Sequence, residues 1–191
     1  MRVSLAAVLL LFLAGCGITI QTGPEDEQRR TEVSETRAKQ VRGEYATLFQ
    51  GANSRAIAGH VKNLIDSVSA NYSRYGLQMV AEWRAGNQGR GAPVQDTEIR
   101  DLISRSNQSQ QALLGAYEDI VELGISRIKE LREFDEHSFA LLDQFAQKFY
   151  EIRSTVFFPS GTVDQYELEV SNAQSGLERA SRELDRDLQR Y

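Results

Sequence analysis

The residue with the clearest chemistry is Cys16, the single cysteine of the 191-residue chain. It closes the tetrapeptide Leu-Ala-Gly-Cys at positions 13–16, and an unbroken apolar run from Leu5 to Ala14 leads up to it after a charged start at Arg2. A helix needs about 20 apolar residues to cross a bilayer, so this run is too short to span one. Its length and flanks are those of a secretory signal peptide that ends in small residues before a cleavage point. A lone cysteine cannot form an internal disulfide, and a free thiol is unusual in an exported protein.

The tetrapeptide 13–16 resembles the lipobox of bacterial lipoproteins. The resemblance implies that 1–15 is a signal peptide and that the sulfur of Cys16 receives a diacylglyceryl group. The new amino terminus is usually acylated as well, with fatty acids such as palmitate. Two or three acyl chains exceed the marginal binding of a single chain, so the anchor is expected to be stable. Within this family, Gly17 after the cysteine favours the outer membrane, and we expect the periplasmic side rather than the cell surface.

No other residues have the spacing of a catalytic or metal centre. The two histidines are His60 and His137, and no Glu-x-x-His motif of a di-iron bundle occurs. Met79 falls on an apolar stripe, where a core position is expected. The chain lacks Gly-x-Ser-x-Gly, and its glycine-rich stretch at 86–91 does not have the spacing of a phosphate-binding loop. We therefore expect no catalytic, cofactor or metal site, and a protein that is not an enzyme.

Composition indicates a helical, acidic domain. The 27 acidic and 22 basic residues give a net charge of −5, and loss of the leader with Arg2 makes it more negative. This balance is opposite to the basic footprint of a nucleic-acid-binding protein, so no nucleic-acid partner is expected. Only three prolines interrupt a chain rich in helix-forming residues. Residues 16–24 are expected to form the lipidated cysteine and a short tether, and 25–191 a single all-α domain.

Apolar residues recur in steps of three and four over 25–50, 54–84, 96–131, 139–156 and 162–191, which predicts amphipathic helices. Between the first two, residues 51–54 could form a tight turn with Asn53 as the cap, or a weak point in a continuous helix. The stretch 86–93 holds three glycines and a proline, which indicates a loop before Asp96 caps the next helix. Thr162 and Gln165 fit a capping box for the last helix.

Two architectures fit this pattern. If 51–54 and 134–138 are both turns, the chain is a compact five-helix bundle. If neither is a turn, 25–86 and 96–157 form an elongated antiparallel coiled-coil hairpin, with the C-terminal helix as its third strand. The seam of the last helix repeats close to every 3.5 residues, the value of a coiled coil, which makes self-association plausible.

Two surface features are potential contact sites. Phe157 and Phe158 lie in an expected turn, where they could dip into the lipid interface or close the end of the core. Trp83, Arg84 and Arg90 flank or lie in the glycine-rich loop, which could contact a partner or be an ordinary connection.

These observations predict a lipid-anchored cell-envelope helical bundle that acts as a non-enzymatic scaffold or adaptor. The membrane is its expected partner through the anchor, together with an envelope protein or a second copy. The alternative is a bundle that carries a lipid, haem or metal ligand between its helices.

Overall fold

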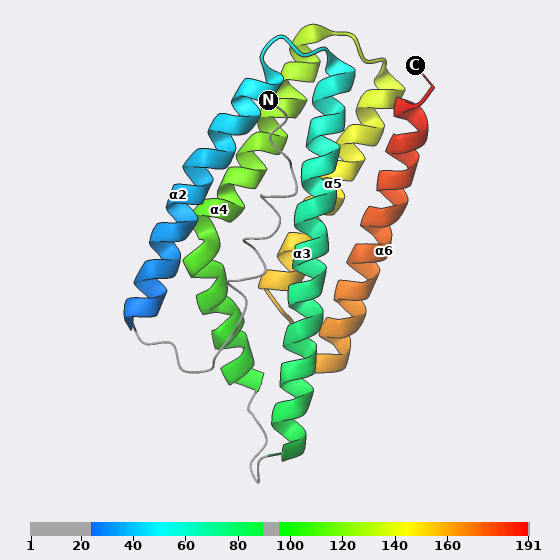
Figure 1. Cartoon of the computed structure of the whole chain (residues 1–191). Coiled ribbons are helices and arrows are strands. Elements are labelled where there is room, and N and C mark those ends of the chain that lie inside the picture. Colours follow the sequence, from blue (N-terminus) through cyan, green and yellow to red (C-terminus); the bar gives the residue numbers. More distant parts are fainter. Residues whose placement is uncertain (1–23, 90–95, 191) are drawn as a thin grey trace.

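A computed structural model of the chain describes residues 24–89 and 96–190. Within those ranges the chain forms five helices and no strand, and successive helices run in opposite directions (Figure 1). The helices are α2 (Pro24–Phe49), α3 (Ser54–Gly89), α4 (Asp96–Leu131), α5 (Glu136–Phe157) and α6 (Val163–Leu188). The prediction of an all-α bundle is confirmed. At 1.5 Å per residue, the 36 residues of α3 and of α4 make each about 54 Å long.

The compact bundle, rather than the elongated hairpin, is the correct architecture, because both potential turns reverse the chain. After α2, Gly51 takes φ +69°, a left-handed conformation that glycine adopts without steric cost. Asn53 then caps α3, since its Oδ1 accepts a hydrogen bond from the backbone N–H of Ala56 at 2.9 Å. After α4, Arg132 takes φ +54°, and Asp135 caps α5 by accepting from the N–H of Ser138 at 2.7 Å.

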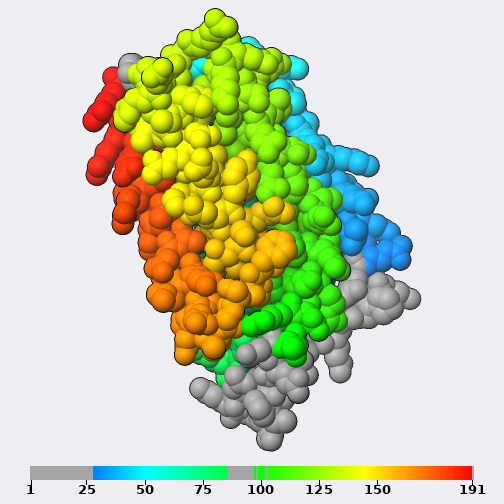
Figure 2. Space-filling view, turned by 180° about the vertical axis from the view of Figure 1, so that it is seen from behind, coloured from blue at the N-terminus to red at the C-terminus, as the bar shows by residue number. Residues whose placement is uncertain are grey.

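Helix α3 lies at the centre of the bundle, in contact with α4, α5 and α6, whereas α2 packs mainly on α4. From behind, α5 lies between α4 and α6, with α2 at the far edge beside α4 (Figure 2). Because neighbours surround α3, only a narrow stripe of it is exposed, and its apolar side chains supply much of the core. Its largest fully buried side chains are Ile57, Ile65, Met79 and Trp83.

An ion-pair cluster around the buried Lys62 ties α3 to α6. The Nζ of Lys62 lies 2.7 Å from Oδ2 of Asp66 and 3.0 Å from Oδ2 of Asp185, and the Ser181 hydroxyl donates to the other oxygen of Asp66. Burial by itself lowers the pKa of Lys62, but the hydrogen bonds to the two aspartates raise it overall. The lysine therefore stays charged and joins the two helices.

The ends of the helices follow the sequence closely, with one exception. The capping box of Thr162 and Gln165 is present, and α4 begins at Asp96 as expected, although the side chain of Asp96 lies outside the described part. The expected loop at 86–93 begins later than predicted, because α3 continues to Gly89. No helix in the described ranges has an apolar stretch long enough to cross a membrane.

Candidate functional site

The alternating helices give the bundle two distinct ends. At the lower end in Figure 1, α2, α4 and α6 begin and α3 ends, and the end of α5 points the same way. At the upper end lie the turns 50–53 and 132–135 and the last residue of α6, Leu188. Cys16 and Arg90, two of the residues predicted to act in anchoring or contact, lie outside the described residues.

The predicted contact residues around the turns divide into buried and exposed ones. Trp83 is fully buried against Tyr166, with ring centroids 6.4 Å apart, so the expectation that it contacts a partner at the surface does not fit its position. Phe157 is 4% exposed and stacks on Tyr75 at 5.5 Å, so it closes the core. Phe158 is 62% exposed and is the only ring of the pair that any outside surface could touch.

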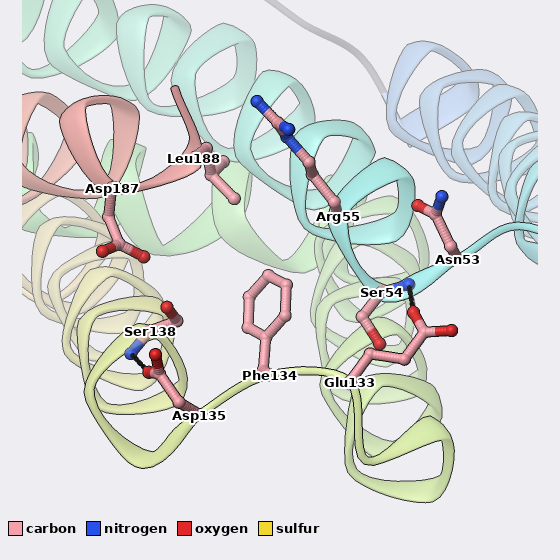
Figure 3. Close-up of a pocket in the computed structure, with 9 residues that line it drawn as sticks. All are labelled: Asn53, Ser54, Arg55, Glu133, Phe134, Asp135, Ser138, Asp187 and Leu188. Atoms are coloured by element: carbon pink, nitrogen blue, oxygen red, sulfur yellow. Dashed lines mark hydrogen bonds between the residues drawn. The ribbon is translucent and has the colours of Figure 1, made fainter. Parts of the chain in front are cut away.

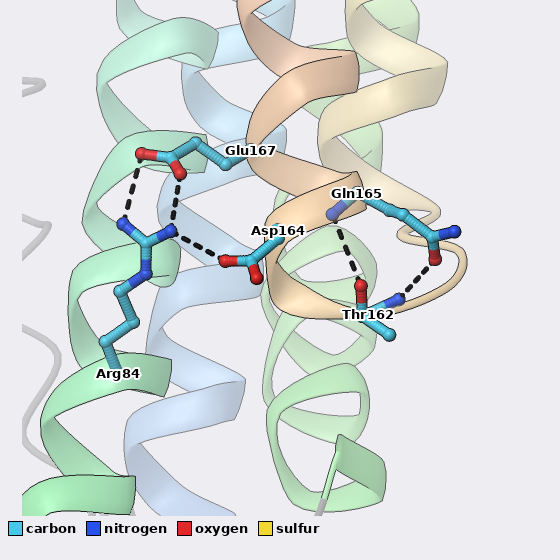
Figure 4. A network of polar contacts seen from close by, with 5 residues as sticks. All are labelled: Arg84, Thr162, Asp164, Gln165 and Glu167. Atoms are coloured by element: carbon cyan, nitrogen blue, oxygen red, sulfur yellow. Dashed lines mark hydrogen bonds and ion pairs between the residues drawn. The ribbon is translucent and has the colours of Figure 1, made fainter.

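Arg84 lies on the surface but is engaged within the bundle. Its guanidinium contacts Asp164 at 2.8 Å and Glu167 at 2.6 Å, both at the start of α6 (Figure 4). These acidic residues sit beside the capping box of Thr162 and Gln165, where the helix macrodipole favours negative charge. The arginine therefore pins α3 to the start of α6, and a partner would have to compete with two carboxylates for it.

The regular seam of α6 is also used inside the bundle. Its apolar positions, including Tyr166, Val170, Leu177 and Leu184, are buried, and α6 packs on α3 and α5. The hydroxyl of Tyr166 donates to the carbonyl of Val156 at 2.9 Å, which fixes the register of α6 on α5. A second copy of the chain therefore cannot use this seam without opening the bundle.

A pocket of about 440 Å³ lies at the upper end, where the two turns meet the end of α6. Its lining comes from all three places: Asn53, Ser54, Arg55, Glu133, Phe134, Asp135, Ser138, Asp187 and Leu188. In Figure 3 the ring of Phe134 stands between Ser54 on one side and Asp187 with Ser138 on the other. The side chain of Arg55 extends away from this ring. The pocket thus presents carboxylates and hydroxyls around one aromatic ring.

Two of the three carboxylates that line the pocket accept hydrogen bonds from backbone N–H groups at the start of a helix. Glu133 accepts a hydrogen bond from the backbone N–H of Ser54 at 2.7 Å, in the first turn of α3. Asp135 is the N-cap of α5. Backbone N–H groups at a helix start are unpaired within the helix and carry partial positive charge, so both carboxylates stabilise the turns.

The third carboxylate, that of Asp187, lies at the end of a helix rather than at a helix start. Asp187 is 5% exposed, and its Oδ2 is buried without a hydrogen-bond partner among the described residues. It lies in the last turn of α6, where the macrodipole disfavours a negative charge. A buried carboxylate without a donor is costly and uncommon, and such departures gather at functional sites.

The pocket has one signal in the sequence, and it is weak. Along α6 the seam runs through 166, 170, 173, 177, 180 and 184 in alternating steps of four and three. The next position in that alternation is 187, which places an aspartate in a row of apolar residues. Sequence alone favours Leu188 as the next apolar position and places Asp187 on a solvated helix face.

A second buried polar group lies in the middle of the bundle. Arg153 of α5 pairs with Glu118 of α4, and burial raises the pKa of Glu118 despite the arginine. The hydroxyl of Tyr72 is buried nearby, and burial raises its pKa well above the usual value. The ion pair joins α4 and α5, although Nε of Arg153 and the Tyr72 hydroxyl have no hydrogen-bond partner among the described residues.

The described residues form an all-helical bundle with a pocket at one end, lined by carboxylates, hydroxyls and apolar side chains. No group of three His, Cys, Asp or Glu residues in the described ranges could hold a metal ion.

The chain is similar to the methyl-accepting chemotaxis protein McpN of Pseudomonas aeruginosa, with 27% identity over 146 residues. The match covers 74% of this chain and 26% of that protein, so the chain spans about a quarter of its relative's length. No family model and no solved structure matches the chain.

Proposed function

We propose that the protein is a lipid-anchored cell-envelope bundle that acts as a non-enzymatic interaction protein, a scaffold or adaptor. Cys16 is the attachment point, and the outer membrane, on its periplasmic side, is the location. The similarity to part of a methyl-accepting chemotaxis protein supports a sensory or signalling setting for such a module.

The observation that carries this proposal is the direction of the helices. Helix α2 begins at the lower end of the bundle, and the residues between Cys16 and Pro24 can extend over at most about 29 Å. A lipid on Cys16 therefore holds the lower end close to the membrane. The exposed ring of Phe158 belongs to that end, where it suits the lipid interface. The upper end, with its pocket, is directed away from the membrane and toward partners.

The anchor is tested by the intact mass and the membrane retention of the full chain. We expect the purified wild-type protein to begin at Cys16, to carry acyl groups and to stay with membranes through a high-salt wash. The Cys16→Ser variant should carry no acyl mass, because a hydroxyl does not replace the thiol as acceptor. A wild-type protein without acyl groups would contradict the anchor.

The direction of the bundle is tested by photocrosslinking in cells. A photoreactive residue in place of Arg132, exposed at the upper end, should link the chain to one defined protein. The same residue in place of exposed Glu169, near the start of α6, is the matched control and should not link to that protein. Equal recovery from both positions, or no defined product from Arg132, would count against an adaptor that works through its upper end.

A second candidate function, a ligand-carrying bundle, is favoured by the pocket at the upper end. Its lining combines carboxylates with apolar surface, which suits a small charged ligand with an apolar body better than the lipid, haem or metal expected from the sequence. The chemistry of that ligand follows from the charges in the pocket.

A further inference from the structure

We propose that the pocket at the upper end binds a small organic ammonium ion, held by the carboxylate of Asp187 across the ring of Phe134. This inference deepens the proposed function, because it names a ligand for the end of the bundle that points away from the membrane. It depends on the proposed function only for that direction.

Among the described residues, the fold leaves one carboxylate oxygen of the pocket without a hydrogen-bond donor. Glu133 and Asp135 are offset by the starts of α3 and α5. Asp187 differs from them: it is buried, its Oδ2 accepts no hydrogen bond from the part of the chain that the structure describes, and it lies at the negative end of α6. A positive group in the pocket would offset the cost of burying the carboxylate and would supply the missing hydrogen bond. It would also be attracted by the negative end of the α6 dipole.

The cations of residues 24–89 and 96–190 do not fill this role. Within those ranges, Arg55 is the one basic residue that lines the pocket, and its side chain extends away from the Phe134 ring (Figure 3). Lys62, the buried lysine of α3, is held by Asp66 and Asp185 instead. The missing positive charge therefore has to come from a ligand.

The remaining walls specify an ammonium on an organic body rather than a bare metal ion. Ser54 is fully buried, and its Oγ has no hydrogen-bond partner in the described ranges, so it offers a second acceptor for N–H. The ring of Phe134 lies between Ser54 and Asp187, where it can stack on an apolar body or face the cation. A metal ion would require several carboxylates to converge, and no such group occurs among the described residues. The volume of about 440 Å³ lies within the range of small-molecule pockets.

The probe is fluorobenzylammonium, with neutral fluorobenzyl alcohol as its uncharged match, observed by fluorine NMR on the full chain in detergent. We expect the ammonium to bind saturably and the alcohol to bind at least about tenfold more weakly, because a charge-assisted hydrogen bond is lost. Asp187→Asn should weaken binding of the ammonium by about tenfold or more for the same reason. Asp119→Asn removes one exposed carboxylate on α4, far from the pocket lining, and should bind as the wild type does.

A second readout separates a binding role from a structural one. Without ligand, Asp187→Asn should raise the melting temperature by about 2–4 °C, since it removes a buried, unpaired charge. A carboxylate that supports the fold would lower the melting temperature when replaced. Ser54→Ala keeps every carboxylate and should weaken the ammonium several-fold, which provides a test if Asp187→Asn misfolds.

Three results would overturn the inference. The first is equal binding of the alcohol and the ammonium, and the second is unchanged binding of the ammonium in Asp187→Asn. The third is no binding of the ammonium by the folded wild type up to about 10 mM, a concentration beyond the weak end of specific affinities. None of them bears on the anchor, which the mass of Cys16 tests by itself.

Discussion

Replacing Gly124 with alanine should destabilise the bundle, whereas the same change at Gly115 of the same helix should stabilise it. Both glycines lie inside α4. A Cβ on Gly115 would meet nothing within 4 Å, but one on Gly124 would lie 2.3 Å from Cγ2 of Val61 and 3.3 Å from the ring of Phe49. Gly124 therefore permits the close approach of α4 to α3 and to the end of α2.

The expected magnitudes follow from two opposing effects. Alanine is favoured over glycine inside a helix by about 1 kcal/mol, and Gly115→Ala should gain about that amount. At Gly124 the new methyl group must move from 2.3 Å to an ordinary contact of about 3.5–4 Å. Val61 is fully buried and β-branched, so it cannot rotate away easily. Overpacking of this kind costs about 1–3 kcal/mol, which cancels or exceeds the helix gain.

The assay is urea unfolding followed by far-ultraviolet circular dichroism. Gly124→Ala should be less stable than Gly115→Ala by about 1–3 kcal/mol, or about 2–12 °C in melting temperature. Adding Val61→Ala removes the clashing carbon, so the double variant with Gly124→Ala should be more stable than the sum of the two single effects by about 1 kcal/mol. If both glycine variants gain equal stability, or if the double variant is simply additive, the reasoning about close packing is refuted.

Three further predictions follow from local contacts. Phe157→Ala should cost about 3–5 kcal/mol and Phe158→Ala less than about 0.5 kcal/mol in urea unfolding, because only the first ring is buried; similar costs would contradict this. Thr162→Ala should cost about 1 kcal/mol through loss of the capping box, and an unchanged urea midpoint would show that the cap contributes nothing. Because burial raises the pKa of Glu118 above 4.5, folding favours its protonated form, so its contribution to wild-type stability is present below that value and lost as the pH rises. Relative to wild type, Glu118→Gln should therefore gain stability from pH 4 to pH 7, and a relative loss in that range would reverse the argument.

The helices and most of their ends could be predicted from the sequence because they depend on neighbours within a few residues. Apolar steps of three and four predict a helix wherever it packs, and the caps at Asn53 and Thr162 bond to backbone groups three residues away. The glycine-rich stretch was the exception: α3 runs through Gly86 to Gly89.

The pocket depends on residues that are far apart in the sequence. Ser54 follows the first turn, Glu133 and Asp135 belong to the second, and Asp187 is near the end of the chain. Each has an ordinary local explanation as a cap residue or a helix surface residue. Only the packing of α3, α4, α5 and α6 brings them to one end of the bundle. Trp83 shows the opposite case, since its neighbours in the sequence suggested a surface loop and packing buries it.

By itself, the sequence determined the helical periodicity and the caps, both of which are local, and the export signal around Cys16 stays a prediction. Whether the chain folds as a rod or a bundle was decided by tertiary structure. A 3.6-residue pattern continues equally well through 51–54 as a helix or on either side of a turn. The reversal is favoured because it packs the apolar stripe of α2 onto α4 and surrounds α3 on most sides, which removes more apolar surface from water. The same reversal places the start of α2 and the pocket at opposite ends of the molecule.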